Sequence, residues 1–296
     1  MITFQHRLEY LGYRIIEKLI CSLPDDSLSA FACPFAFLLF HVIGIRKKVT
    51  LENLTIAFPE KSIAWRKKMA YNSYLHFLVM MLEFMKMQRW SLSKLYSKFR
   101  MAEIDKLLPV LQKGKSAILV SGHFGNWEVA MGYLHYHQIK STAIQQNQQN
   151  DLINQRMKIL HQQRGIEIVD THGAVNNCKI ALRKGRVAAI LADQDAGHRG
   201  VFVPFFSRPA STHIGAALLH LSTGAPLFLS TCNRVSKHQF ELFFHRINGL
   251  KDNSVSDENI HYLTSQLMSQ LEKAIRKHPE QYFWMHRRWK TSPKKT

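Results

Sequence analysis

The stretch that decides the fold is residues 117–137, AILVSGHFGNWEVAMGYLHYH. Its first four residues form a short apolar run of the kind found in buried strands, and residues 122–126 contain the glycines and the asparagine of a turn. From residue 127 to residue 137 the apolar positions recur with helical spacing. The stretch therefore predicts a strand, a loop and a helix in immediate succession.

The same alternation recurs further along the chain. Apolar runs predict strands at residues 166–169, 187–192 and 227–231, and helical spacing predicts helices at residues 174–184 and 212–222. Strands that alternate with helices predict an α/β fold, in which a sheet is flanked by helices and functional side chains gather at the carboxyl ends of the strands.

The amino-terminal part of the chain is more apolar. Residues 28–45, LSAFACPFAFLLFHVIGI, are about long enough to span a bilayer. Pro34 would kink such a helix and His41 is polar, so a buried core helix or an interfacial hairpin remains an alternative. Arg46, Lys47 and Lys48 follow at once and would hold this end at an anionic cytoplasmic leaflet. Residues 62–87 have the spacing of a second helix, whose apolar stripe is typical of a core.

Charge points to anionic partners. The chain has 40 Lys and Arg against 21 Asp and Glu, a net charge of +19, which fits phospholipid surfaces, phosphorylated glycolipids, acidic carrier proteins and nucleic acids alike. Between residues 86 and 100 five basic residues occur without an acidic one. That stretch is either a membrane-contacting surface or an ordinary solvated helix face.

A histidine and a glutamate stand in the loop and helix of the opening stretch. His123 and Glu128 are five positions apart in SGHFGNWE, and no other of the 16 histidines has an acidic residue at that spacing. We expect Glu128 to accept a hydrogen bond from one ring nitrogen, so that the other nitrogen can act as a base. A substrate hydroxyl would then attack a thioester directly, with a nearby cation or backbone amide stabilising the oxyanion. The alternative is a histidine that caps a loop and a glutamate at a favourable helix N-terminus.

Several other chemistries do not fit the sequence. Ser121 lacks the flanking glycines of the G-x-S-x-G nucleophile turn, because Leu119 and His123 occupy those positions. The histidines form no HExxH pattern, and the four cysteines are too widely spaced for a zinc knuckle or a disulfide framework. No zinc-ligand spacing, RNA-recognition aromatic signature or leucine-zipper heptad indicates a nucleic-acid fold.

Five motifs, taken in order, resemble those of the bacterial lipid A biosynthesis late acyltransferases. This lauroyl/myristoyl acyltransferase family is part of the lysophospholipid acyltransferase superfamily. The motifs are LENLTIAFPEKS at 51–62, SGHFGNWE at 121–128, LADQDAGHRGVFVPFF at 191–206, TGAP at 223–226 and PEQYFWMHRRWK at 279–290. The His-x4-Glu element resembles the His-x4-Asp signature of the wider glycerol-phosphate acyltransferase group.

The resemblance implies a glycerol-phosphate acyltransferase-like sheet flanked by helices. Residues 1–48 would form a membrane-associating helical segment and residues 49–296 the acyltransferase domain. It also implies an acyl carrier protein thioester, or acyl-CoA, as donor and a Kdo-bearing lipid A precursor, an anionic glycolipid, as acceptor. The enzyme would act at membrane phospholipid on the cytoplasmic face of the cell inner membrane, without a metal or other cofactor and without nucleic acid.

Further candidate residues follow from the same motifs. Asp193 and Asp195 end the predicted strand 187–192, where their carboxylates could order the catalytic loop or bind a sugar hydroxyl, or could simply form a turn. Phe202, Phe205, Phe206 and Trp127 are candidates for the lining of an acyl pocket.

Four arginines are candidates for binding a phosphate or the oxyanion, because a guanidinium presents a fixed fork of donors. Arg156 and Arg164 lie in a glutamine-rich stretch that departs from the family pattern, since an arginine and a proline usual early in it are missing. Arg287 and Arg288 stand in the terminal motif, where a basic tail lying on phospholipid is the alternative.

Two other functions remain open. A phosphatidylinositol mannoside or other glycolipid acyltransferase using acyl-CoA would keep the chemistry and change the acceptor. A non-catalytic basic protein that binds membranes or nucleic acid would tolerate replacement of His123, and its binding to nucleic acid would depend strongly on salt.

Overall fold

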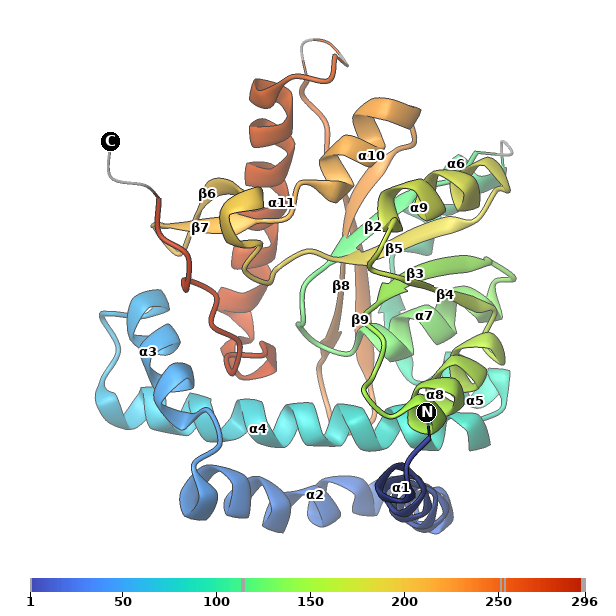
Figure 1. Cartoon of the computed structure of the whole chain (residues 1–296), viewed down its shortest axis with the longest axis vertical. Coiled ribbons are helices and arrows are strands. Elements are labelled where there is room, and N and C mark those ends of the chain that lie inside the picture. Colours follow the sequence, from blue (N-terminus) through green and yellow to red (C-terminus); the bar gives the residue numbers. More distant parts are fainter. Residues whose placement is uncertain (1, 113–114, 251, 253, 294–296) are drawn as a thin grey trace.

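The computed structural model describes residues 2–112, 115–250, 252 and 254–293 (Figure 1). Within them, a seven-stranded sheet has the order β1-β9-β8-β2-β5-β3-β4, and β6 and β7 form a separate two-stranded sheet. The strands are β1 (Phe99–Ala102), β2 (Ile118–Ser121), β3 (Ser141–Gln145), β4 (Ile166–Asp170), β5 (Val187–Leu191), β6 (Val201–Phe205), β7 (Arg208–Thr212), β8 (Leu227–Arg234) and β9 (Phe240–Arg246). The helices are α1 (Phe4–Ser22), α2 (Leu28–Phe37), α3 (Lys47–Ala57), α4 (Ile63–Lys86), α5 (Leu92–Ser97), α6 (Leu108–Gln112), α7 (Trp127–Tyr136), α8 (Asp151–Gln162), α9 (Ala174–Arg183), α10 (Gly215–Thr223) and α11 (Asp257–Lys277). The α/β fold expected from the sequence is confirmed.

The strand that begins the deciding stretch lies at the centre of the sheet. β2 pairs in parallel with β5 on one side and with β8 on the other, so that Ile118 lies opposite Ala188 and Leu227. Because parallel strands end at the same edge, the loop after β2 and the loop after β5 are neighbours. Ser121 and Leu191, the last residues of these strands, lie opposite each other.

Helices cover both faces of the sheet. Side chains alternate between faces along a strand, and Val120 packs into the core formed with α9, α10 and α11, whereas Leu119 packs with α7. Strands buried on both faces read as continuous apolar runs, which explains the unbroken run at residues 117–120.

A long helix supports the carboxyl edge of the sheet. α4 runs beneath the sheet in Figure 1 and contacts α2, α3, α7 and the carboxyl-terminal segment. It begins at the N-cap Ser62, whose hydroxyl accepts a hydrogen bond from the backbone N of Trp65 at 3.2 Å.

The amino-terminal helices form an outer layer below α4 (Figure 1). In the helix that starts at Asp25, Leu28, Ala32, Ala36 and Phe40 are buried at every fourth position, and this stripe belongs to the α2 contact with α4. The helix passes Pro34 and continues as a π-helix, Leu38–Ile43. By length and composition, Asp25–Ile43 could cross a membrane, with a mean hydropathy of 1.6.

Both outer helices also expose large apolar side chains. These are Phe4, Leu8, Leu11, Ile15, Ile16 and Leu19 on α1, and Phe35, Phe37, Leu38, Val42 and Ile43 on α2 and its π-helical end. Large apolar side chains exposed in number on two neighbouring helices mark a site of membrane or protein contact.

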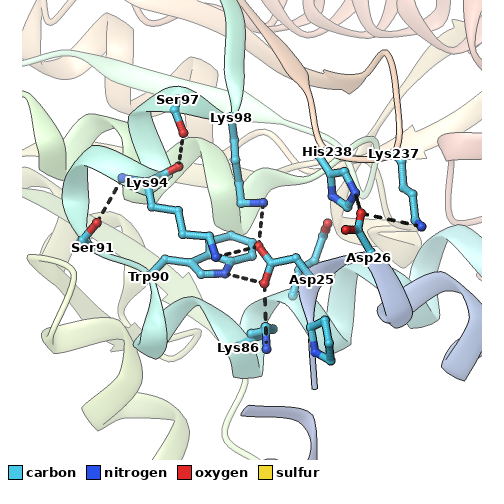
Figure 2. Close-up of polar contacts among 12 residues, drawn as sticks. Asp25, Asp26, Lys86, Trp90, Ser91, Lys94, Ser97, Lys98, Lys237 and His238 are labelled. Atoms are coloured by element: carbon cyan, nitrogen blue, oxygen red, sulfur yellow. Dashed lines mark hydrogen bonds and ion pairs between the residues drawn. The ribbon is translucent and has the colours of Figure 1, made fainter. Parts of the chain in front are cut away.

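The basic stretch at residues 86–100 is divided between surface and interior. Arg89, Lys94 and Arg100 are exposed, whereas Lys86 and Lys98 are buried, so the expectation of an outer basic surface is wrong for those two lysines. Lys86 and Lys98 are only 5% and 7% exposed, and both pair with Asp25, as does Lys94 (Figure 2). The Trp90 indole N–H donates to the same carboxylate at 3.2 Å. A buried charge requires a partner, and here Asp25 comes from a segment 61 to 73 positions earlier in the chain, a pairing that a local charge count cannot show.

Candidate active site

The loop after β2 holds His123 through a backbone shape that needs glycine. Gly125 has φ +64°, and a Cβ built on it would lie 1.9 Å from the carbonyl oxygen of Cys232. Its backbone N donates to the carbonyl of Gln281 at 3.0 Å, and the backbone N of Phe283 donates to the carbonyl of His123 at 2.9 Å. The loop is therefore fastened between β8 and the carboxyl-terminal segment.

Asp193 holds the imidazole of His123. Nδ1 of His123 lies 2.8 Å from one carboxylate oxygen of Asp193, and the backbone N of His123 donates to the other oxygen at 2.9 Å. Asp193 is only 2% exposed. Burial alone would raise the pKa of this carboxyl, but the charge of His123 and its two hydrogen bonds outweigh burial and lower the pKa to about 2. The carboxylate therefore stays ionised and favours a proton on Nδ1.

The other ring nitrogen, Nε2, contacts the side chain of Gln194. With Nδ1 protonated, Nε2 carries a lone pair, and the side-chain nitrogen of Gln194 lies 3.4 Å from it. The ring is flanked by Trp127 and Phe283, whose ring centroids lie 5.3 and 6.1 Å from that of His123. A base held in this way can accept a proton from a hydroxyl placed at Nε2.

Glu128 does not make the hydrogen bond that we expected. Its two carboxylate oxygens lie 3.1 and 3.3 Å from Nε2 of His161 on α8, while Nδ1 of His123 is engaged by Asp193. Glu128 lies in the first turn of α7 and its side chain contacts α8, whereas the loop that follows β5 reaches His123. The sequence spacing was compatible with a His123–Glu128 contact, but the parallel pairing of β2 and β5 supplies Asp193 instead.

Glu128, His161 and Arg164 form a second polar cluster at the cavity. Burial raises the pKa of the Glu128 carboxyl, yet the charge and hydrogen bond of His161 outweigh it, so the pKa lies below its usual value. Burial likewise lowers the pKa of His161, but the charge and hydrogen bond of Glu128 reverse the shift and raise it. Arg164 is 7% exposed and donates to the carbonyl of Phe84 at 3.1 Å.

α4 supplies buried polar support for the catalytic loop. Nε2 of His76 lies 3.0 Å from the carbonyl of Gly125, and burial, followed by the charge of Arg234, lowers the pKa of His76 to about 3. Two turns further along α4, the carboxylate of Glu83 accepts hydrogen bonds from the side chain of Asn126 at 2.7 Å and from Arg234 at 3.0 Å. Asn126 in turn caps α7 by accepting from the backbone N of Val129 at 3.0 Å.

Sequence reasoning missed these supporting residues. His76 and Glu83 are seven positions apart, which places them on one face of α4 two turns apart. Polar residues within the buried stripe of a core helix were the available signal.

Asp195 and Arg288 fasten the carboxyl-terminal segment rather than lie against His123. The carboxylate of Asp195 accepts from the hydroxyl of Thr291 at 2.9 Å, and its backbone N donates to Nε2 of His286 at 2.8 Å. Burial lowers the pKa of His286 to about 4, which keeps the ring neutral and able to accept. Arg288 is 1% exposed and donates to the hydroxyl of Thr212 at 2.6 Å.

The remaining predicted arginines lie apart from the imidazole. Arg156 donates to Glu17 of α1 at 2.7 Å and to Gln88 at 2.8 Å, so it joins α8 to α1 and to the 3-10 turn that follows α4. Arg287 is exposed and lines a separate groove. Among the contacts of the described residues, none of the four predicted arginines reaches His123.

A cavity of about 800 Å³ opens beside His123. It is lined largely by apolar side chains, including Leu119, Ala130, Leu134 and Phe244 from one face of the sheet and Cys178, Ile190, Ala216 and Leu219 from the other. Trp127 lines it as expected. The expectation for Phe205 and Phe206 is wrong, because both are buried in an aromatic cluster with Tyr282 and Trp284, and Phe202 is not among the lining residues either. The cavity has the apolar character and size of a lipid-chain site.

The described part of the chain contains no group of three or more His, Cys, Asp and Glu side chains placed to hold a metal ion. The histidine and carboxylate of the site face each other as a hydrogen-bonded pair. Such a pair beside an apolar cavity is equipped for proton transfer to or from a substrate with a long apolar part.

Comparison with known proteins identifies the family of the chain. The family model for the bacterial lipid A biosynthesis acyltransferases matches residues 2–291. The lipid A biosynthesis palmitoleoyltransferase of Escherichia coli K12 is 27% identical over 290 residues, covering 96% of this chain and 89% of that protein. The lauroyltransferase of the same organism is 24% identical, with 97% and 92% covered. A phosphatidylinositol mannoside acyltransferase of Mycobacterium tuberculosis is 29% identical over 134 residues, which cover 44% of this chain and 42% of that protein. The chain therefore belongs to the bacterial lipid A biosynthesis acyltransferase family and is an enzyme that forms O-acyl esters in lipid A biosynthesis.

Proposed function

We propose that the protein transfers one fatty acyl chain from an acyl carrier protein thioester to a hydroxyl of a Kdo-bearing lipid A precursor, with His123 as general base and Asp193 as the residue that orients it. The observation that carries this proposal is the two-point contact between Asp193 and His123 at the mouth of the apolar cavity. It leaves Nε2 as the one ring nitrogen with a lone pair for substrate.

In the first step, the acceptor hydroxyl attacks the carbonyl carbon of the thioester while its proton passes to Nε2 of His123. Asp193 stabilises the imidazolium that forms, since its carboxylate is already ionised. The tetrahedral intermediate then collapses, the carbon–sulfur bond breaks, and the sulfur takes the proton back from Nε2. The products are an ester and a free thiol, and the imidazole is neutral again.

The oxyanion needs a hydrogen-bond donor close to the base. We assign this role to the side-chain amide of Gln194, which lies next to Nε2 of His123 and lines the cavity. A neutral amide can serve as this donor. Removing one donor of this kind from an acyl-transfer site lowers the rate by about 100-fold or more, which shows how much a single amide contributes.

Glu128 acts on the site through its surroundings. Its ion pair with His161 joins the first turn of α7 to α8 across the cavity wall. We propose that Glu128 positions α7, and with it Trp127, and that the donor acyl chain lies between α7 and the sheet, against Leu119 and Ala130.

Association with a membrane follows from the outer helices. Asp25–Ile43 is apolar, and the relatives act in the biosynthesis of a membrane lipid. We propose that α1 and α2 lie in the interface on the cytoplasmic face of the inner membrane rather than crossing it. The buried stripe from Leu28 to Phe40 packs against α4. The large exposed apolar side chains of both helices face away from α4 and would contact lipid.

The substrate assignment is tested with the purified protein. Acyl carrier protein thioester and a Kdo-bearing lipid A precursor should yield a product with one added acyl chain, measured by mass spectrometry. The alternative acceptor is a phosphatidylinositol mannoside with acyl-CoA as donor. Transfer to that acceptor and none to the lipid A precursor would refute the substrate assignment and leave the roles of His123 and Asp193 standing.

A further inference from the structure

A basic groove separate from the cavity beside His123 is lined in part by the carboxyl-terminal segment. It is a cavity of about 1160 Å³ between α3, the start of β7 and the segment from Arg287 to Lys290. Its charged lining consists of one acidic residue, Glu52, and five cations: Lys47, Lys48, Arg208, Arg287 and Lys290.

In the part of the chain that the structure describes, the five cations of this groove outnumber its one acidic residue, Glu52. Among the residues that the structure describes, none of the five cations forms an ion pair with a carboxylate. The lysines around Asp25 are the contrasting case, because there three cations share a carboxylate (Figure 2). Unpaired cations that surround a concave surface attract an anion, and guanidinium groups match the oxygens of a phosphate.

A second unused group lines the same groove. Trp289 is 8% exposed, and its indole N–H has no hydrogen-bond partner among the described residues. A buried donor without a partner is rare in folded proteins. Together with the five cations, it indicates a ligand that brings acceptor oxygens.

The position of the groove relates it to both the membrane face and the catalytic base. Gly44 lines the groove and directly follows Ile43, which is 56% exposed on the apolar face. Arg287 also lines the groove and lies four residues after Phe283, whose backbone N donates to the carbonyl of His123. Four residues span at most about 14 Å, so one lipid molecule can have a charge in the groove and a hydroxyl near His123.

We propose that this groove binds a phosphate-bearing headgroup of the glycolipid acceptor. This inference rests on the proposed function, which it extends by naming where the acceptor is held. A lipid is favoured over an acidic carrier protein because the groove begins where the apolar face ends, and a lipid headgroup occurs at that boundary.

The test uses two matched double variants of the full-length protein. Arg287→Gln with Lys290→Gln removes two exposed cations of the groove. Arg183→Gln with Lys184→Gln removes two exposed cations at the end of α9, on the opposite edge of the sheet from His123. Equilibrium binding of the phosphorylated lipid A precursor, presented in uncharged detergent micelles without acyl donor, is measured for both variants and the wild type. The same titration is repeated with the dephosphorylated lipid.

Binding of the phosphorylated lipid should weaken about tenfold or more in the groove variant, because charge-assisted hydrogen bonds are lost, and it should change less than about twofold in the α9 variant. Removing the phosphates should weaken binding to the wild type and have little further effect on the groove variant. Unchanged affinity in the groove variant would overturn the proposal. So would a rise in KM for the carrier-bound donor with lipid binding intact, since the groove would then dock the carrier protein. Wild-type protein that binds the lipid through the groove and transfers no acyl chain to it would refute the proposed function instead.

Discussion

The carboxylate of Asp193 makes two hydrogen bonds to His123, one to Nδ1 of the ring at 2.8 Å and one to the backbone N at 2.9 Å, although the residues are 70 positions apart in the chain. The backbone contact fixes the loop and the ring contact fixes the tautomer. The carboxylate that we propose orients the base therefore comes from the loop after β5, a neighbour of β2 in the sheet.

Replacing Asp193 with Asn keeps the shape of the side chain and removes its charge. We expect kcat to fall by about 100-fold or more, because the imidazolium is no longer stabilised and Nδ1 is no longer held as a donor. Asp195→Asn is the matched control, since Asp195 contacts Thr291 and not His123. Initial rates of acyl transfer are measured for both variants and for the wild type. An equal loss of rate in the two variants would mean that Asp193 has only a structural role.

The Glu128–His161 pair predicts a pH-dependent contribution to stability. The pKa of Glu128 is lowered from 4.5, so its contribution is present above pH 4.5 and is lost as pH falls through the lowered value. The pKa of His161 is raised from 6.5, so its contribution is full below pH 6.5 and is lost as pH rises through the raised value. The pair thus stabilises most between pH 4.5 and 6.5.

Glu128→Gln should therefore lower the free energy of unfolding more at about pH 5.5 than at about pH 8.5. Denaturant unfolding of both proteins in the same detergent measures the difference. A loss of the same size at both pH values would contradict an ionised pair.

The sequence predicted the elements around the site closely. The strand at residues 117–120 is β2 (Ile118–Ser121), and the helix at 127–137 is α7 (Trp127–Tyr136). Local periodicity is sufficient for these elements because apolar runs and helical spacing reflect their own burial. The helix predicted from residue 212 starts later, at Gly215, because Thr212 belongs to β7 and pairs with Val201. β9 was not predicted, although Phe240, Leu242 and Phe244 alternate inward in the way typical of a strand.

Partners that tertiary contacts bring together were less predictable. His123 and Glu128 were expected to meet because they are close in sequence, yet each finds its partner in a distant segment, Asp193 and His161. Asp193 was expected to order the catalytic loop, bind a sugar hydroxyl or simply form a turn, and in the structure it contacts His123. Arg156 and the lysines near Asp25 have counter-charges in α1 and the α1–α2 connection, which no local pattern indicates.

Filling the cavity beside His123 should change which donor chain lengths the enzyme prefers. Ala130 lines it from α7 and is 8% exposed. Ala130→Phe should reduce the rate with long-chain donors more than with short-chain donors, because the added ring occupies space between α7 and the sheet. Competition between carrier-bound chains of two lengths, followed by mass spectrometry, gives the ratio. An equal loss for all lengths would place the donor chain elsewhere.

We expect the exposed apolar residues of α1 to bind the membrane. Leu11→Glu with Ile15→Glu places two charges on a surface that we assign to lipid, and should shift the protein from vesicles to the soluble fraction in a flotation assay. Ile180→Glu with Val255→Glu makes the same change at exposed apolar residues outside α1 and α2 and should leave flotation unchanged. If both double variants floated with the vesicles as the wild type does, the assignment of this α1 surface to lipid would be wrong.

The central claim is that His123 is the base for acyl transfer to the lipid A precursor. Its most direct test is the turnover of His123→Ala with carrier-bound donor and Kdo-bearing precursor, with product followed by mass spectrometry. We predict a loss of at least about 100-fold in turnover, with thermal unfolding and micelle association like those of the wild type. Turnover within a few-fold of the wild type would contradict the account.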